Sequence, residues 1–183
     1  MATKNSKTST KTTASKSNNI ISEPIEMKEK AQPLIAKDID LHQYITVRNG
    51  FQGKLVYQST KTGEHFVWDD FGAEQEMELL ELRNAKNSKK KYFSNNWFMF
   101  DEDWVVDFLG VRQYYKHAVK IEDFDKIFSL SPTEIKKTVS LLSDGQKKSV
   151  AYRAKALIAD GEIDSNKAII ALEESLGVEL VER

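Results

Sequence analysis

Short runs of β-branched and aromatic residues mark the first part of the chain that can fold. Residues 44–47 (Tyr-Ile-Thr-Val) precede the turn dipeptide Asn49-Gly50, and two more apolar runs follow at residues 54–57 and 65–68. Such side chains favour strands, and the intervening polar segment includes a glycine that can adopt a positive φ. The pattern predicts a small antiparallel sheet in which residues 54–57 and 65–68 pair as a hairpin.

A helical pattern follows Gly72. Residues 73–86 place apolar positions among glutamates, which predicts an acidic helix with its glutamates gathered toward the N-terminus, where the helix dipole favours them. Residues 97–100 predict a short buried strand or loop. Residues 104–109 and 111–117 predict two short helices separated by a glycine.

The last third of the chain carries clear signals for helix ends. The segment Ser131-Pro132-Thr133-Glu134 is a capping box with proline at the first helical position, so a helix is expected over about 132–142. A break at residues 143–145 precedes a helix that ends at Gly161. Asp164 is expected to cap a last helix, closed by Gly177. The fold class predicted is α+β, a small N-terminal antiparallel β-sheet followed by a helical C-terminal half.

Residues 1–40 follow neither pattern. Nearly all of the first nineteen are Ser, Thr, Lys, Asn or Ala, and they include four lysines and no acid. Such a segment cannot bury enough apolar area to offset the entropy of ordering, so we expect a disordered, flexible polar arm or linker. We expect one globular domain over 41–183, β-rich over 41–70 and mainly helical over 72–183. Isolated apolar residues of the arm are candidates for docking on a partner: Ile20, Ile21, Ile25, Leu34 and Ile35.

Length and composition exclude several classes of function. The chain has 183 residues with 27 basic and 28 acidic side chains and no cysteine, so it suits one ordinary domain without disulfides, a thiolate nucleophile or a Cys-ligated zinc site. No apolar run reaches the roughly 18–20 residues of a membrane span. The first residues also lack the apolar core of a secretory signal. We expect a soluble protein with no membrane partner.

Motifs for catalysis and cofactor binding do not occur in the sequence. Asp70-Phe71-Gly72 matches the magnesium-binding tripeptide of protein kinases, but the other kinase motifs are missing and the chain is too short for two lobes. We interpret the phenylalanine as a core residue and the glycine as the start of a helix. The three histidines do not have metal-ligand spacing. We therefore predict no catalytic residue, no cofactor, no metal, no small-molecule substrate and no enzymatic activity.

Two basic features could contact nucleic acid. The first is a lysine cluster that directly precedes two aromatic residues: Lys86, Lys89, Lys90 and Lys91, then Tyr92 and Phe93. It combines attraction for phosphates with rings that can stack on bases. The second is one face of the helix expected after residue 145: Lys148, Tyr152 and Lys155. For the lysine cluster, the alternative is a solvated helix end with Tyr92 and Phe93 buried in the core. The acidic remainder of the chain would also repel DNA, so nucleic acid is not the favoured partner.

Segments along the chain together form a recognisable pattern. Its four main motif segments are Gly53-Lys54-Leu55-Val56-Tyr57, Phe66-Val67-Trp68-Asp69-Asp70-Phe71-Gly72, Asn95-Asn96-Trp97 and Ser143-Asp144-Gly145-Gln146-Lys147-Lys148. Shorter matches are Thr62-Gly63-Glu64, Glu74-Gln75-Glu76-Met77, Glu81-Leu82-Arg83, Phe93, Leu109-Gly110-Val111 and Tyr114-Tyr115. The pattern resembles small proteins of tailed bacteriophages that are often encoded among virion-structural genes. The resemblance covers residues 44–181 and brings no catalytic or ligand residues with it. It implies a structural or assembly protein that docks on other virion proteins of the capsid, neck or tail, located in the virion and, during assembly, in the host cytoplasm.

Two other functions are compatible with the sequence. One is a DNA-binding or regulatory protein that uses the predicted helix face around Tyr152 or the cluster over 86–91. The other is an assembly chaperone that leaves before the particle matures. The resemblance favours the structural role over both, and it does not specify the location within the particle.

Overall fold

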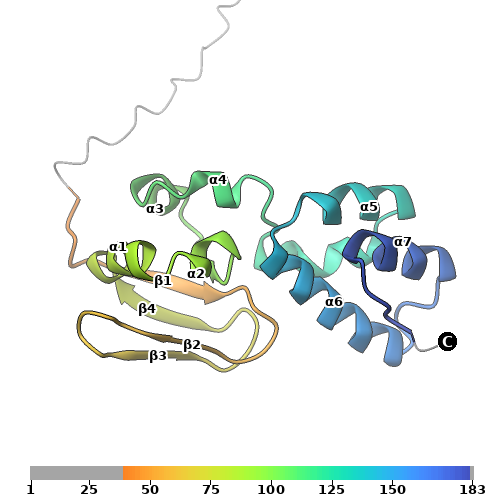
Figure 1. Cartoon of the computed structure of the whole chain (residues 1–183), viewed down its shortest axis with the longest axis horizontal. Helices are drawn as coiled ribbons and strands as arrows, with labels where there is room; N and C mark the ends of the chain where they lie inside the picture. Colours follow the sequence, from red (N-terminus) through yellow and green to blue (C-terminus); the bar gives the residue numbers. More distant parts are fainter. Residues whose placement is uncertain (1–38, 182–183) are drawn as a thin grey trace, which may run out of the picture. The chain divides into compact units, whose positions relative to one another are not determined.

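The first half of the fold is built around a three-stranded antiparallel sheet in the computed structural model, which describes residues 39–181 (Figure 1). Strand β1 (Tyr44–Asn49) lies between β4 (Glu74–Glu78) and β5 (Phe98–Met99). Alternate residues of β1 face the core, and Ile45 and Val47 are buried. The predicted order, a small antiparallel sheet followed by helices, is confirmed.

The predicted hairpin is confirmed, but it forms a two-stranded sheet of its own, whereas the sequence pattern placed it in one sheet with residues 44–47. Strands β2 (Leu55–Gln58) and β3 (His65–Trp68) pair antiparallel, and the inward-facing Tyr57 and Trp68 are buried. An isolated two-stranded hairpin is marginally stable in water, so it needs a partner surface. The indole of Trp68 supplies a direct link, because its Nε1 donates a hydrogen bond to the carbonyl of Val47 at 2.8 Å.

The prediction of a helix over residues 73–86 is wrong in its first part. These residues begin as strand β4, and helix α1 (Leu79–Ser88) starts only afterwards. Gly72 has a φ of 78° and precedes a strand, so it does not start a helix. The strand is favoured because its backbone completes a ladder with β1, in which Met77 lies opposite Ile45 and is fully buried. A glutamate-rich segment thus forms a strand through a partner that is distant in sequence.

Three short helices complete the first core: α2 (Lys91–Ser94), α3 (Asp103–Phe108) and α4 (Arg112–Tyr115). Residues 97–100 were predicted as a short buried strand or loop, and they contain the buried strand β5; the two predicted helices around Gly110 are confirmed. Gly110 follows α3 with a φ of 66°. Phe93 and Phe98 are both fully buried in this core, with their ring centres 5.5 Å apart.

The second half contains a 3-10 segment, η1 (Ile121–Ser129), and three helices: α5 (Pro132–Leu141), α6 (Asp144–Ala159) and α7 (Asn166–Leu176). They enclose a second hydrophobic core. The predicted capping box of α5 is confirmed, as are the helix ends before Gly161 and Gly177. The cap of α7 is Ser165 rather than Asp164, because the Ser165 hydroxyl accepts a hydrogen bond from the Ala168 N–H.

Close contacts join the two cores. The ring of Phe71 reaches from the turn before β4 into the second core, with its centre 4.7 Å from that of Phe124. The hydroxyl of Ser149 on α6 donates to the carbonyl of Gly50 at 3.1 Å. Gly145 packs so tightly on Asn95 that an added Cβ would lie 2.1 Å from the Asn95 carbonyl oxygen. The residues that the structure describes belong to one compact unit.

Candidate functional site

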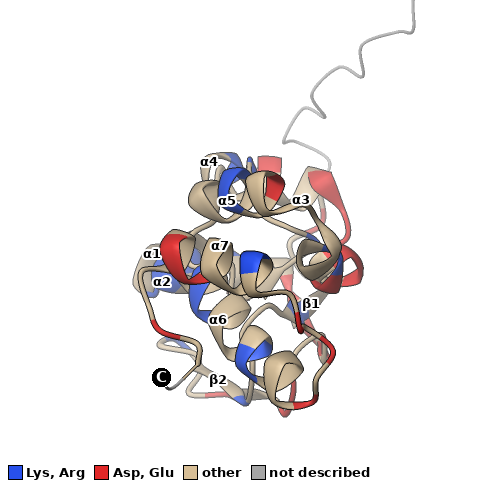
Figure 2. Ribbon diagram, turned by 90° about the vertical axis from the view of Figure 1, so that its right-hand side faces the viewer, with Lys and Arg blue, Asp and Glu red and all other residues tan. Residues whose placement is uncertain are grey.

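The exposed face of α6 carries the second basic feature found in the sequence. Lys148, Tyr152 and Lys155 are spaced as neighbours on a helix and all three are exposed, with Tyr152 at 65%. The structure therefore places these three predicted residues together on α6, the helix labelled in Figure 2. Neither lysine forms an ion pair with another residue in 39–181. The face presents two uncompensated cations on either side of an aromatic ring.

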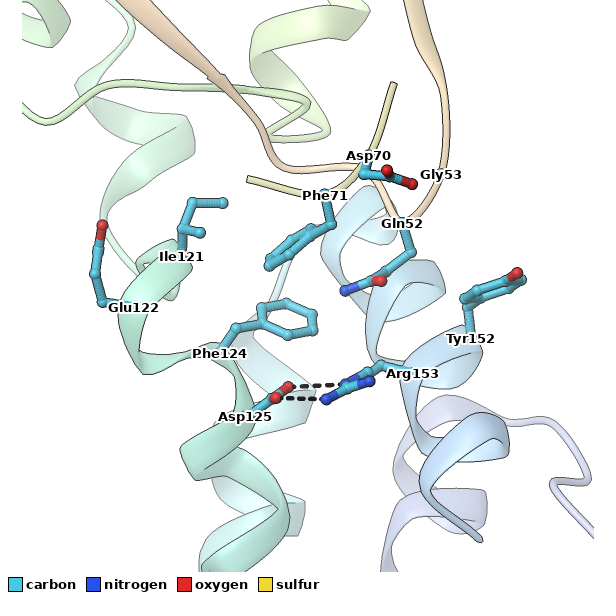
Figure 3. Close-up of a pocket in the computed structure, with 10 residues that line it drawn as sticks. All are labelled: Gln52, Gly53, Asp70, Phe71, Ile121, Glu122, Phe124, Asp125, Tyr152 and Arg153. Atoms are coloured by element: carbon cyan, nitrogen blue, oxygen red, sulfur yellow. Dashed lines mark hydrogen bonds and ion pairs between the residues drawn. The ribbon is translucent and has the colours of Figure 1, made fainter. Parts of the chain in front are cut away.

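A cavity of about 470 Å³ lies on one side of this face, where the two halves of the fold meet. Its walls come from the β1–β2 loop, the turn before β4, η1 and α6 (Figure 3): Gln52, Gly53, Asp70, Phe71, Ile121, Glu122, Phe124, Asp125, Tyr152 and Arg153. Phe71 and Phe124 pack against each other in its wall, with ring centres 4.7 Å apart, and Tyr152 lies at its edge (Figure 3). The cavity combines an aromatic interior with a charged margin.

The charges at the cavity are mostly compensated within the chain. Arg153 Nε and Nη2 donate to the two carboxylate oxygens of Asp125 at 3.1 and 2.8 Å, and this hydrogen bonding raises the pKa of Arg153. Glu122 accepts from Arg48, which Glu74 also contacts. The hydrogen bond from Glu74 raises the pKa of Arg48. Asp70 has no ion-pair partner among the described side chains.

The chemistry available in the cavity follows from this set of residues. The described lining residues include three carboxylates, one guanidinium and one phenol but no His, Ser, Thr or Lys. Their carboxylates and guanidinium can orient a polar group, and their rings can pack on an apolar one. The cavity can therefore make both polar and apolar contacts with another molecule.

The lysine cluster over 86–91 is spread over two helices. Lys86 lies in the last turn of α1 and Lys91 starts α2, whereas Lys89 and Lys90 lie between them. The Lys89 ammonium is 5.4 Å from the ring centre of Tyr57, and that of Lys90 is 5.5 Å from the ring centre of Tyr114. Two of the four cations thus contact aromatic rings of this chain.

The aromatic residues beside this cluster belong to the core. Phe93 is fully buried, and the hydroxyl of the half-buried Tyr92 donates to the carbonyl of Val56 at 2.6 Å. Burial raises the pKa of Tyr92, whereas the hydrogen bond with Lys90 lowers that of Tyr114. Phe93 cannot stack on bases without unpacking the core, so the cluster lacks the free aromatic platform that single-strand binding uses.

The other residues singled out in the sequence have separate positions. Phe71 is a core residue, as predicted. His42 is exposed and lies 3.3 Å from a carboxylate oxygen of Glu78. Within residues 39–181, no three side chains of the metal-binding types form a group that could hold an ion. In the same part of the chain, no helix is both long and apolar enough to cross a membrane. The docking residues predicted over 20–35 lie outside the described residues.

Sequence reasoning missed the cavity and its ion pair. Asp125 and Arg153 are 28 positions apart in the sequence. Asp125 lies on the 3-10 segment η1, for which the sequence carried no recognisable secondary-structure signal. The phenylalanine of the kinase-like tripeptide was the only indication that this turn reaches the core. No protein-family model, curated protein or solved structure matches the chain.

Proposed function

We propose that the chain is a non-enzymatic structural or assembly protein of a tailed-phage virion that docks on other virion proteins. The resemblance of its four motif segments to small phage proteins suggests the setting. The observation that carries the proposal is that polar residues of those segments are engaged in holding the fold together. These residues form hydrogen bonds within the fold, as expected of a structural protein.

Gln146 and Asn96 illustrate this inward use. Gln146 binds both backbone groups of Val119, donating from Nε2 to its carbonyl at 2.8 Å and accepting from its N–H at Oε1 at 3.1 Å. Asn96 is fully buried, and its amide donates to the carbonyl of Tyr114 at 3.0 Å. Buried polar groups that are paired, as the Gln146 amide and Asn96 Nδ2 are, specify a unique packing, whereas the buried Asn96 Oδ1 has no hydrogen-bond partner among the described residues. They support a scaffold role for the motifs.

A scaffold protein needs surfaces that contact its neighbours. The apolar residues over 20–35 suit such a contact, because a polar arm with few apolar positions can order on binding and cover a large area. The exposed face of α6 and the adjoining cavity add a second contact surface on the folded part. Both features favour protein partners over a small-molecule substrate.

Deletion of residues 1–40 tests the docking role of the arm. We expect the remaining chain to keep its circular dichroism spectrum and cooperative unfolding but to enter particles at a reduced copy number, measured by quantitative mass spectrometry. A full-length chain with Ile20→Ser, Ile21→Ser and Ile25→Ser should show the same reduction. Conservative changes in the polar part, Thr8→Ser, Thr10→Ser and Thr12→Ser, serve as the control. An unchanged copy number after the deletion would refute the docking role.

The face of α6 favours a second candidate function, a DNA-binding or regulatory protein. Lys148 and Lys155 could contact phosphates while Tyr152 stacks on a base. This function predicts that the logarithm of DNA affinity falls steeply with the logarithm of salt concentration, and that Lys148→Ala reduces the slope. A flat response, or no binding at low salt, would exclude it.

A further inference from the structure

A groove lies beside the exposed face of α6, between this helix and the end of α7. Its volume is about 260 Å³, and it is lined by Asp144, Lys147, Lys148, Ala151, Leu176 and Val178. Val178 is 44% exposed, and Leu176 and Ala151 are half-buried. The groove therefore has an aliphatic wall and a margin with two lysines and Asp144, a net positive charge, and neither lysine forms an ion pair with a described residue.

The dimensions and lining of the groove indicate a protein segment as its occupant. Small-molecule sites usually enclose about 300–1,000 Å³, so this groove suits one or two aliphatic side chains better than a whole ligand. Nucleic acid would use the lysines but leave the aliphatic wall exposed to water. Apolar side chains with charged residues at the margin are typical of protein contacts.

We propose that this groove receives residues 20–26 of a second copy of the chain, Ile-Ile-Ser-Glu-Pro-Ile-Glu. This inference rests on the proposed docking role of the arm and identifies its receptor. The segment supplies three isoleucines for the aliphatic wall and two carboxylates, Glu23 and Glu26, for Lys147 and Lys148. The other apolar pair of the arm, Leu34-Ile35, is flanked by Lys30 and Lys37, so it would bring like charges to the lysine margin.

Each copy carries one such segment and one such groove. A contact between two different surfaces joins copies head to tail, and it produces a ring where the rotation closes and a filament where it does not. This contact would arrange the protein as a ring or filament of repeated copies, which suits a virion component.

Site-specific photocrosslinking tests the contact directly. The full-length chain carries Tyr152→benzoylphenylalanine, because Tyr152 is exposed and follows Lys148 of the groove by about one turn of α6. An equal mixture of chains with natural and heavy nitrogen is irradiated and digested with trypsin. We expect the photoreactive residue to be joined to the tryptic peptide over 17–28, with natural and heavy partners combined in the same product.

Charge reversal tests the pairing of the groove with the segment. The groove variant Lys147→Glu, Lys148→Glu and the arm variant Glu23→Lys, Glu26→Lys should each weaken self-association by at least about tenfold. A chain that carries all four changes should recover it. The matched control is Lys61→Glu, in the β2–β3 turn, where the lysine is exposed and lies outside the groove. Sedimentation velocity over a concentration series measures the association.

Three results would overturn the inference: a crosslink to a different segment, a crosslink within single chains only, or a crosslink to nucleic acid. Failure of the four-change chain to recover association would also overturn it. The copy number of the chain in particles distinguishes failure of the groove contact from failure of the proposed virion role. A groove variant that enters particles at the wild-type copy number, while wild type gives no crosslink, removes the groove contact and leaves the virion role standing. Absence of the wild-type chain from particles removes the virion role itself.

Discussion

Gly145 lies in the first turn of α6, against the backbone of Asn95. A Cβ at this position would come within 2.1 Å of the Asn95 carbonyl oxygen and 2.5 Å of its Cβ, both closer than atoms can approach. The absence of a side chain therefore lets α6 contact the loop before β5. Sequence reasoning treated this glycine as part of a helix break, because glycine is a poor helix former and its contact is remote in sequence.

The variant Gly145→Ala should destabilise the protein by about 2 kcal/mol or more, because the contact with Asn95 involves backbone that cannot move aside. At an unhindered helical position, the same change would stabilise by up to about 1 kcal/mol. Urea unfolding followed by circular dichroism measures the difference. Lys155→Ala, at an exposed site on the same helix, is the control and should change stability by less than about 0.5 kcal/mol. A more stable Gly145→Ala variant would contradict the packing.

The capping box of α5 gives a pH dependence with a defined sign. Hydrogen bonds from the Ser131 hydroxyl and backbone N–H lower the pKa of Glu134 below its ordinary value of 4.5. A carboxylate with a lowered folded pKa stabilises the native state at higher pH, and this contribution is lost as the pH falls through the folded pKa. Wild type should therefore exceed Glu134→Gln in stability at pH 7, and the gap should close below pH 4.5. A stability difference that does not change with pH would show that the charged Glu134 carboxylate is not its source.

At the scale of elements, the local sequence pattern predicted the helices and strands that are stabilised by contacts between residues close in sequence. The capping box, the hairpin and the helices that end at glycines follow from short stretches of sequence. Strand β4 does not, because its glutamates resemble the acidic start of a helix and only pairing with β1 decides the outcome. The α6 face of the candidate site was predictable from helical spacing, whereas the cavity beside it depends on how distant elements meet.

The strand geometry of β4 predicts a sharp difference between neighbouring residues. Met77 is fully buried and faces Ile45, whereas Glu76 is exposed. Met77→Ala should cost about 2–5 kcal/mol through the cavity that it leaves, and Glu76→Ala should cost less than about 0.5 kcal/mol. Thermal unfolding of both variants measures this difference. Similar small effects at the two positions would contradict the assigned strand.

The part of the molecule that the structure describes contains two hydrophobic cores, which are joined by contacts at several points. Phe71 provides one of these contacts, because it lies in the turn before β4 and its ring packs on Phe124 in the second core. Arg48 provides another through its contact with Glu122 on η1. These links predict that neither core unfolds independently of the other.

The variant Phe71→Ala tests this coupling. Removal of the half-buried ring should destabilise the protein by about 2 kcal/mol through loss of apolar burial. Wild type should give a single transition, with far-ultraviolet circular dichroism and tryptophan fluorescence coinciding, since the tryptophans belong to the first core and α5–α7 to the second. Two separate transitions in the wild-type protein would show that the cores are independent.

The proposed role in a virion is most directly tested by quantitative mass spectrometry of gradient-purified phage particles that includes this chain and the major capsid protein. The proposal predicts that the chain is present at a fixed whole-number ratio to the capsid protein, and the ratio would indicate its location in the particle. Absence from particles together with abundance in the infected cytoplasm would contradict a structural role. That result would instead favour an assembly chaperone or a DNA-binding regulator.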